Sequence, residues 1–304
     1  MDAETAPEAE AGAGPEDRPL SDTARVAREA LAGVAPEPGA PKPDPILTAV
    51  GVRRMFGGIT AVDVERVEVQ RGSITALIGP NGAGKTTFFN LMTGFDTPNA
   101  GEWTFDGASM DGVQPHQMAK RGMVRTFQLT KSLAKLPVIE NMKLGATEQV
   151  GEKWWNGLLP YRWKYQEMEI EARADELLRR FKLDHMRDEY AGALSGGQRK
   201  LLEMARALMT NPTLVMLDEP MAGVNPALKQ SLNQHVKALR DEGMTVLFVE
   251  HDMDMVHDIS DWVIVMAEGR VIAEGTPDDI ASNPAVIDAY LGLHQGRSLF
   301  EEQP

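Results

Sequence analysis

A glycine-rich segment that ends in lysine and threonine is the first part of the sequence able to do chemistry. It follows the pattern G-x-x-x-x-G-K-T and comprises Gly79, Pro80, Asn81, Gly82, Ala83, Gly84, Lys85 and Thr86, with Thr87 next to it. The glycines allow main-chain amides to face an anion, and a helix expected to begin near Lys85 adds the positive end of its dipole. Lys85 supplies a point charge for terminal phosphates, and the Thr86 hydroxyl suits a Mg²⁺ ligand. The segment predicts binding of a nucleoside triphosphate rather than a chance glycine turn.

Two acidic residues, Asp218 and Glu219, follow the apolar run Leu214–Leu217. At the carboxyl end of a strand in a parallel sheet, they would face the ligand crevice and hence the phosphates. Asp218 suits the organisation of Mg²⁺ through water. Glu219 suits the polarisation of the attacking water, because a positioned carboxylate can orient water and accept its proton. The alternative is a solvated strand end, which the phosphate-binding segment upstream disfavours.

Strands and helices alternate around both motifs, which predicts how the motifs are positioned. Alternating elements of this length indicate an α/β fold with a parallel sheet covered on both faces. The expected strands are Ser73–Ile78, Leu214–Asp218, Thr245–Glu250 and Trp262–Met266, and the expected helices are Gly197–Met209, Pro226–Glu242 and Met253–Ile259. Three further runs predict an antiparallel sheet: Ile46–Val52, Asp63–Gln70 and Trp103–Phe105. The middle of the chain, about residues 129–190, is expected to be helical.

A third motif lies between the helical middle and the acidic strand end, and it reads Leu194, Ser195, Gly196, Gly197 and Gln198. With the phosphate-binding segment before it and the two acids after it, the sequence resembles the nucleotide-binding subunits of ABC transporters over about residues 46–292. The resemblance implies a P-loop ATPase core with an antiparallel β subdomain, a helical subdomain at about residues 129–193 and a C-terminal tail at residues 293–304. It also implies that residues 195–198 contact ATP.

The resemblance assigns roles to three further residues. Phe56 would stack on the adenine ring, unless it is simply a core phenylalanine. Gln128 would offer its amide oxygen to Mg²⁺ or to the attacking water, and His251 would contact the γ-phosphate and that water. A metal site built from His251 and the acidic and histidine side chains that follow it is disfavoured, because four ligands do not converge.

The third motif implies a second ATP-binding subunit, identical or different. Its amides would form an anion site that closes over the ATP of the partner, so that two chains enclose two nucleotides. Ser195 and Gly197 would then touch the opposing γ-phosphate. One position departs from the family pattern, which has aspartate near Asn225. Asparagine can still cap the helix expected from Pro226, but it carries no negative charge.

Four segments resemble the subfamily that serves branched-chain amino acid importers: 92–95, 125–128, 222–226 and 283–292. This implies an ATPase at the cytoplasmic face of the membrane, held by integral membrane permease subunits and served indirectly by an extracytoplasmic substrate-binding protein. Trp154, Trp155 and Trp163 would form a docking surface for the permease, or else the core of their own segment. ATPases that transport urea or lipopolysaccharide remain alternatives, as does a soluble ABC ATPase acting in translation or DNA repair. A P-loop kinase would lack the motif at residues 194–198.

Composition limits the other possibilities. The chain has 304 residues and a formal charge of −14, which argues against nucleic acid as a partner, because phosphate contacts need clustered lysine and arginine. It contains no cysteine, which excludes disulfides and thiolate chemistry. No apolar run approaches the ~18 residues of a membrane span, and the N-terminus lacks a secretory signal pattern. A soluble chain is therefore expected.

Residues 1–45 differ from the rest, with ten acidic residues, four basic residues and eight of the nineteen prolines. Such a segment buries too little apolar surface to offset its chain entropy, so we expect a disordered tail. A helix over Asp22–Val34, with Val26, Ala30 and Leu31 on one face, is expected to be transient. Deletion of residues 1–45 should accordingly leave ATPase activity intact.

Overall fold

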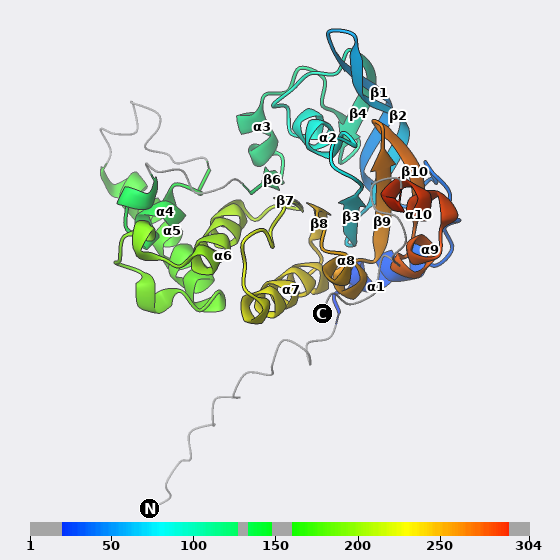
Figure 1. Cartoon of the computed structure of the whole chain (residues 1–304). Coiled ribbons are helices and arrows are strands. Elements are labelled where there is room, and N and C mark those ends of the chain that lie inside the picture. Colours follow the sequence, from blue (N-terminus) through cyan, green and yellow to red (C-terminus); the bar gives the residue numbers. More distant parts are fainter. Residues whose placement is uncertain (1–19, 127–132, 148–159, 292–304) are drawn as a thin grey trace, which may run out of the picture.

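The computed structural model describes residues 20–126, 133–147 and 160–291 (Figure 1). Gln128, Trp154 and Trp155 lie outside these ranges, and the side chain of Trp163 is not described. The described chain forms a central sheet with its helices, a second sheet above it in Figure 1, and a helical part on the left of that view. These three parts correspond to the core, the antiparallel β subdomain and the helical subdomain of the α/β fold predicted from the sequence.

The central sheet has six strands in the order β10-β9-β3-β8-β7-β6. Five run parallel: β3 (Ile74–Ile78), β6 (Met123–Arg125), β7 (Leu214–Asp218), β8 (Thr245–Val249) and β9 (Trp262–Ala267). The sixth, β10 (Arg270–Gly275), pairs antiparallel with β9. All residues of β3 and β8 are buried, as expected of parallel strands covered on both faces. The four strands predicted from sequence are confirmed to within one residue at each end.

Alternate side chains of β3 belong to two hydrophobic clusters, one on each face of the sheet. Ile74, Ala76 and Ile78 pack into a cluster with α7 (Pro226–Asp241) and α8 (Met253–Ile259). On the other face Leu77 packs into a cluster that includes α2 (Lys85–Met92) and the antiparallel sheet. The remaining core helices are α3 (Pro115–Lys120), α9 (Pro277–Ala281) and α10 (Pro284–Leu291). This packing fixes the strands that carry the predicted motifs.

The second sheet is antiparallel, as predicted, with the order β2-β1-β4-β5. Its strands are β1 (Pro45–Phe56), β2 (Ile59–Gln70), β4 (Ala100–Phe105) and β5 (Ala108–Ser109). β1 and β2 are longer than the apolar runs predicted, and they continue as a hairpin to the glycine pair at 57–58. The extension matters because it places Phe56 at the tip of the hairpin.

The helical part comprises α4 (Val138–Lys143), α5 (Pro160–Arg180) and α6 (Gly196–Ala207), with short 3₁₀ helices at Leu133–Lys135, Asp184–Met186, Ala191–Ala193 and Leu208–Thr210. The apolar faces of α4, α5 and α6 join the same buried cluster as α7 and α8. The helical subdomain is therefore packed against the core as well as on itself. The predicted helix Gly197–Met209 corresponds to α6 and the 3₁₀ turn that follows it.

The expectation of a disordered tail through residue 45 is wrong for residues 20–45. Asp22–Leu31 forms helix α1, whose N-cap Ser21 accepts a hydrogen bond from the Ala24 amide. Its buried face consists of Ala24, Ala27 and Leu31, whereas Val26 is 51% exposed. The small alanines allow close packing on the core, and so surfaces far along the chain stabilise a segment that is too polar to fold alone.

Candidate active site

β3 leads directly into the turn Gly79–Gly84 and then into α2. Close backbone contacts require two of the glycines. A Cβ atom at Gly79 would lie 2.0 Å from the Met266 carbonyl oxygen, and one at Gly84 would lie 2.4 Å from the Ala61 carbonyl oxygen. Both glycines also have positive φ, 146° and 98°, which bulkier residues rarely adopt. The sequence therefore forms a tight turn between the carboxyl end of a buried strand and the start of a helix.

The Lys85 ammonium lies inside this turn. Its Nζ donates hydrogen bonds to the carbonyl oxygens of Gly79 and Pro80, at 2.6 and 3.0 Å. Burial lowers the pKa of Lys85, and the negative charge of Glu219 partly opposes that shift. The turn thus combines one cation with main-chain amides at a helix start, which are the groups that hold a polyphosphate.

An open hollow of about 480 Å³ adjoins the turn, lined by Pro80, Asn81, Gly82, Ala83, Ala267, Glu268, Arg270, Ile272, Ala285 and Ala289. Asn81 and Gly82 are exposed at its edge. In the first turn of α2, Thr86 is exposed and Thr87 is half-buried. The tip of the turn and the Thr86 hydroxyl are therefore accessible to a ligand.

Asp218 and Glu219 lie at the end of β7, which is separated from β3 by one strand, β8. The Asp218 side chain is 28% exposed, and its Oδ2 pairs with Arg125 Nη2 at 2.6 Å. Glu219 is exposed and has a φ of 46°. Its amide donates to the Val249 carbonyl oxygen at 3.0 Å, so that the backbone stays tied to β8 beyond the end of β7. Both acids thus lie at the carboxyl end of β7, the edge of the sheet at which β3 leads into the phosphate-binding turn.

His251 follows β8, which lies between β3 and β7. Its side chain is 68% exposed. The phosphate-binding turn, the acids and His251 thus come from the carboxyl ends of three adjacent parallel strands. Gln128 lies outside the described residues, three positions after the last residue of β6. The turn, the two acids and His251 therefore lie along the same edge of the central sheet.

The third motif begins helix α6 in the helical subdomain. Ser195 is its N-cap: the Ser195 hydroxyl accepts from the Gln198 amide, and the Gln198 side chain accepts from the Ser195 amide. Ser195 and Gly196 are exposed. A Cβ atom at Gly197 would lie 1.5 Å from Leu228 Cδ2, and so this glycine allows α6 to pack closely on α7. Asn225 caps α7 through Oδ1, as predicted.

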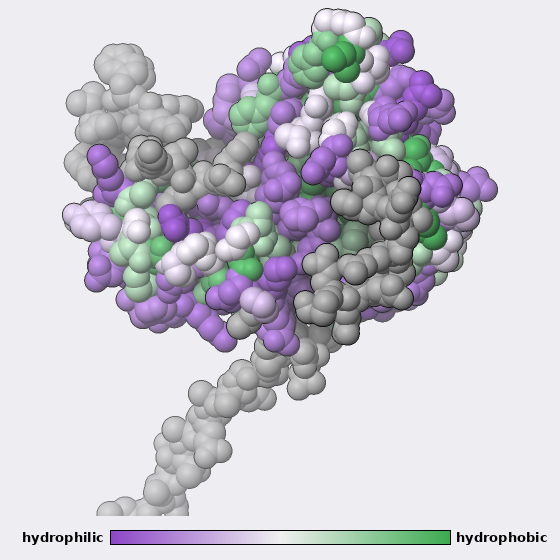
Figure 2. All heavy atoms as spheres, in the orientation of Figure 1, coloured by the Kyte–Doolittle hydropathy of each residue, from purple (hydrophilic) through white to green (hydrophobic). Residues whose placement is uncertain are grey.

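Phe56 lies at the tip of the β1–β2 hairpin, where Figure 2 shows hydrophobic side chains gathered at the top of the molecule. It is 49% exposed and stands opposite Ile59, which is 74% exposed. It is therefore not a core phenylalanine. The Arg54 guanidinium lies 4.6 Å from the ring centroid and pairs with Asp96 at 2.7 Å. A ring held in this way is a platform for a flat aromatic ligand.

Comparison with known proteins decides the family. A sequence model described as ABC transporter matches residues 63–222, which include the phosphate-binding turn, the third motif and both acids. The chain belongs to the ABC transporter family. A second model, described as branched-chain amino acid ATP-binding cassette transporter, matches residues 270–294.

Several named relatives match most of this ABC transporter chain. A relative from Archaeoglobus fulgidus that carries the name LivG is 43% identical over 247 residues, 81% of this chain and 95% of its own length. The Pseudomonas aeruginosa protein BraF, named as a high-affinity branched-chain amino acid transport ATP-binding protein, is 39% identical over 82% of this chain and 98% of its own. A solved nucleotide-free ATP-binding cassette from an ABC transporter has a TM-score of 0.72, with 38% identity, over 81% of this chain and 98% of that one.

The ABC transporter chain is accordingly an ATPase, the ATP-binding subunit of a transporter whose path through the membrane is formed by permease subunits. In the part of the chain that the structure describes, no helix is long and apolar enough to cross a bilayer. Such a subunit is peripheral to the permease.

Arg125 is a site residue that sequence analysis missed. It is the last residue of β6, and its side chain is 7% exposed. Besides Asp218, it donates to Asn90 Oδ1 at 2.7 Å and Thr93 Oγ1 at 3.3 Å, both on or next to α2. Arg125 thereby links the acid at the end of β7 to the helix that follows the phosphate-binding turn. The available signal was a basic residue ending a strand beside the acidic strand, but using it requires knowing that β6 and β7 are neighbours.

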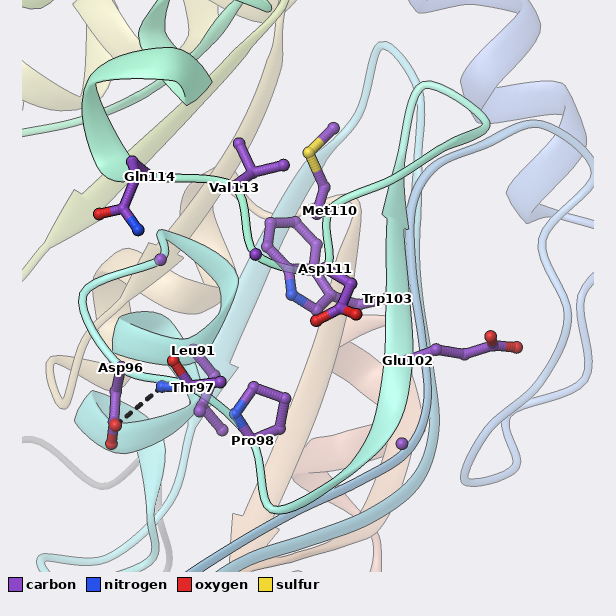
Figure 3. A pocket seen from close by; sticks show the side chains of 13 residues that line it. Leu91, Asp96, Thr97, Pro98, Glu102, Trp103, Met110, Asp111, Val113 and Gln114 are labelled. Atoms are coloured by element: carbon purple, nitrogen blue, oxygen red, sulfur yellow. Dashed lines mark hydrogen bonds between the residues drawn. The ribbon is translucent and has the colours of Figure 1, made fainter.

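Two other places do not compete with this site. A pocket of about 60 Å³ lies between β4 and the loop after α2, lined among others by Leu91, Trp103 and Met110 (Figure 3). Of the three acidic residues that line it, Asp96 accepts a hydrogen bond from the Thr97 amide, at 2.8 Å, and pairs with Arg54. Among the described residues, no group of three or more histidine and acidic side chains could hold a metal ion.

Proposed function

We propose that this ATPase hydrolyses Mg²⁺–ATP between two ATP-binding subunits and thereby powers import of branched-chain amino acids through permease subunits. The observation that carries the hydrolytic part is the arrangement of Lys85, Asp218–Glu219 and His251 at the carboxyl ends of three neighbouring strands. The names of the relatives and the match of residues 270–294 to a branched-chain amino acid cassette support the cargo. Residues 46–292 would form the ATP-binding domain, with residues 129–193 as its helical subdomain and 293–304 as its tail.

Different residues of this chain would bind the nucleotide and carry out the hydrolysis. The amides of residues 79–86 and the Lys85 ammonium would bind the phosphates, and Phe56 would stack on adenine. Glu219 would orient the attacking water and accept its proton, while His251 would donate to the γ-phosphate as charge develops there. Gln128 would contact the water or the metal.

The oxygen donors at this edge fit Mg²⁺. Asp218 offers a carboxylate that is partly exposed and Thr86 an exposed hydroxyl, and oxygen donors are the ligands that Mg²⁺ prefers. Gln128 would add an amide oxygen. When bound, the ion would neutralise negative charge on the phosphates. The ion pair with Arg125 would hold the Asp218 carboxylate in a fixed orientation.

The exposed start of α6 supports a second subunit. Ser195 and Gly196 are exposed at a helix start that lies apart from the chain's own turn at 79–84, and Gly197 and Gln198 follow them in the first turn of that helix. Closing this start over the ATP of a partner, identical or different, would bury the γ-phosphate from both sides. Hydrolysis would then weaken the attraction between the two halves, which is how a bound nucleotide can bias a two-state assembly.

The Lys85→Ala variant is expected to lose nucleotide affinity by roughly 10- to 100-fold, because a hydrogen bond to a charged group is worth about 1.5–3 kcal/mol. Titration calorimetry with Mg²⁺–ATP measures this directly. Lys143→Ala, on α4, serves as a matched control that removes a lysine from another part of the fold and should bind normally. Unchanged affinity in Lys85→Ala would contradict the phosphate site.

Purification of the native protein in detergent should recover integral membrane permease subunits and a second ATP-binding chain. We place the protein at the cytoplasmic face of the membrane, where an extracytoplasmic binding protein would supply cargo to the permease indirectly. Cells that lack this chain should take up labelled leucine, isoleucine and valine more slowly. If uptake of these amino acids is normal but transport of urea or lipopolysaccharide is defective, the assigned cargo is wrong. If the protein copurifies with ribosomes or DNA instead of membrane proteins, the proposed role in transport is wrong.

A further inference from the structure

Glu250 is a buried carboxylate that the hydrolytic site does not yet account for. It directly follows β8 and precedes His251, and its side chain is 1% exposed. A buried carboxylate is costly unless its oxygens are hydrogen-bonded. The contacts that satisfy Glu250 therefore indicate why a glutamate stands at this position.

Both oxygens of Glu250 accept hydrogen bonds from main-chain amides of different loops. Oε1 accepts from the Met221 amide at 2.8 Å, and Oε2 accepts from the His251 amide at 3.1 Å. Met221 lies two residues after Glu219, on the loop that leads to Asn225. One side chain thus joins the loop that carries the hydrolytic carboxylate to the loop that carries the histidine.

A main-chain hydrogen bond also joins the two loops that Glu250 connects. The Glu219 amide donates to the Val249 carbonyl oxygen at 3.0 Å, so the two loops are joined on both sides of the glutamate. Lys229, on α7, donates a hydrogen bond to Asp252 and forms an ion pair with it, and this contact, with smaller contributions from the charges of Asp252, Glu250 and Asp254, raises the pKa of Lys229.

We propose that Glu250 is a positioning residue for ATP hydrolysis, which sets the position of His251 relative to Glu219 through its two amide contacts. This rests on the roles proposed for those two residues. Two N–H donors need two acceptor atoms, and a carboxylate is the side chain that offers two without a donor of its own. In a glutamine, the NH₂ group would face one of the amides, and one loop would be released.

Releasing one loop should slow the chemical step without weakening ATP binding. A misplacement of about 1 Å in a catalytic group costs on the order of 10²-fold in rate. The turn at residues 79–84 and Lys85 make their contacts independently of Glu250. The expected signature is therefore a lower kcat at an unchanged KM, in a variant whose melting curve shows it to be fully folded at the assay temperature.

The experiment compares ATP turnover by the full chain in Glu250→Gln, His251→Ala and the double variant. We expect Glu250→Gln to lower kcat by roughly 10- to 100-fold with KM and ATP affinity within about twofold of wild type. The double variant should fall by less than the product of the two single effects, because aligning two loops matters less once His251 is gone. Effects that multiply fully, or a normal kcat in Glu250→Gln, would overturn the proposal.

Glu274→Gln is the matched control. Glu274 is equally buried, at 1% exposure, but its partners are Gly39, Lys42 and Trp262, away from the strand ends that carry the site. This variant should lower the melting temperature and leave kcat unchanged. An equal loss of kcat in Glu274→Gln would show that Glu250 acts only through stability. If His251→Ala and Glu219→Gln both turn over ATP normally, the proposed hydrolytic roles fail, whereas normal turnover in Glu250→Gln alone defeats only the positioning role.

Discussion

Replacement of Glu219 by glutamine should nearly stop ATP hydrolysis and leave ATP binding intact. Proton transfer by a positioned side chain typically contributes ~10²- to 10⁴-fold in rate, and glutamine cannot accept the proton. The backbone contacts of this residue, with Val249 and with Lys200 Nζ at 3.3 Å, do not involve the carboxylate. The variant should therefore keep the local fold and lose only the chemistry.

The same change should trap two chains around two nucleotides, since the enclosed γ-phosphate is no longer cleaved. Phosphate release and light scattering with Mg²⁺–ATP measure the two effects on one sample. Glu268→Gln is the matched control, because Glu268 is an exposed glutamate that lines the hollow beside the phosphate-binding turn. If Glu219→Gln releases phosphate at the wild-type rate, Glu219 does not act as the proton acceptor.

The features that could be predicted from sequence are those that local rules determine. Gly79 and Gly84 lie where a side chain would clash with a carbonyl oxygen. The turn therefore requires glycine at these positions, and this requirement can be recognised in the sequence. Asp218 interrupts a strand that is otherwise buried. In a parallel sheet such an interruption must face the ligand edge, and so neighbouring strands carry the site together even though their motifs are distant in sequence.

The features that were missed depend on which distant segments become neighbours. Arg125 can pair with Asp218 only because β6 lies beside β7. Glu250 can link two loops only because its Oε1 accepts a hydrogen bond from the Met221 amide. For α1, the apolar residue that sequence favours, Val26, faces solvent, while Ala24 and Ala27 are buried. Small residues carry little hydrophobic signal, so their burial could not be inferred without the surface that covers them.

Removal of residues 1–44 should strongly destabilise the protein, which reverses the expectation drawn from composition. Both side chains of the Lys42–Glu274 pair are fully buried, and their Nζ–Oε2 distance is 2.8 Å. The Lys42 amide also donates to the buried Glu68, at 2.6 Å, and Trp262 donates to Glu274 at 3.0 Å. The N-terminal segment thus supplies the only cation in the described structure that forms an ion pair with Glu274.

Lys42→Met tests this without removing the segment. Breaking a buried pair by removing one partner costs about 3–5 kcal/mol, a large share of the ~5–15 kcal/mol by which a domain is stable. We expect a clear fall in melting temperature for Lys42→Met and a larger one for deletion of residues 1–44, since that deletion also uncovers the surface under Ala24, Ala27 and Leu31. Deletion of residues 1–19 keeps all these contacts and should melt like wild type. Equal melting temperatures for the two deletions would mean that residues 20–44 do not stabilise the ATPase core.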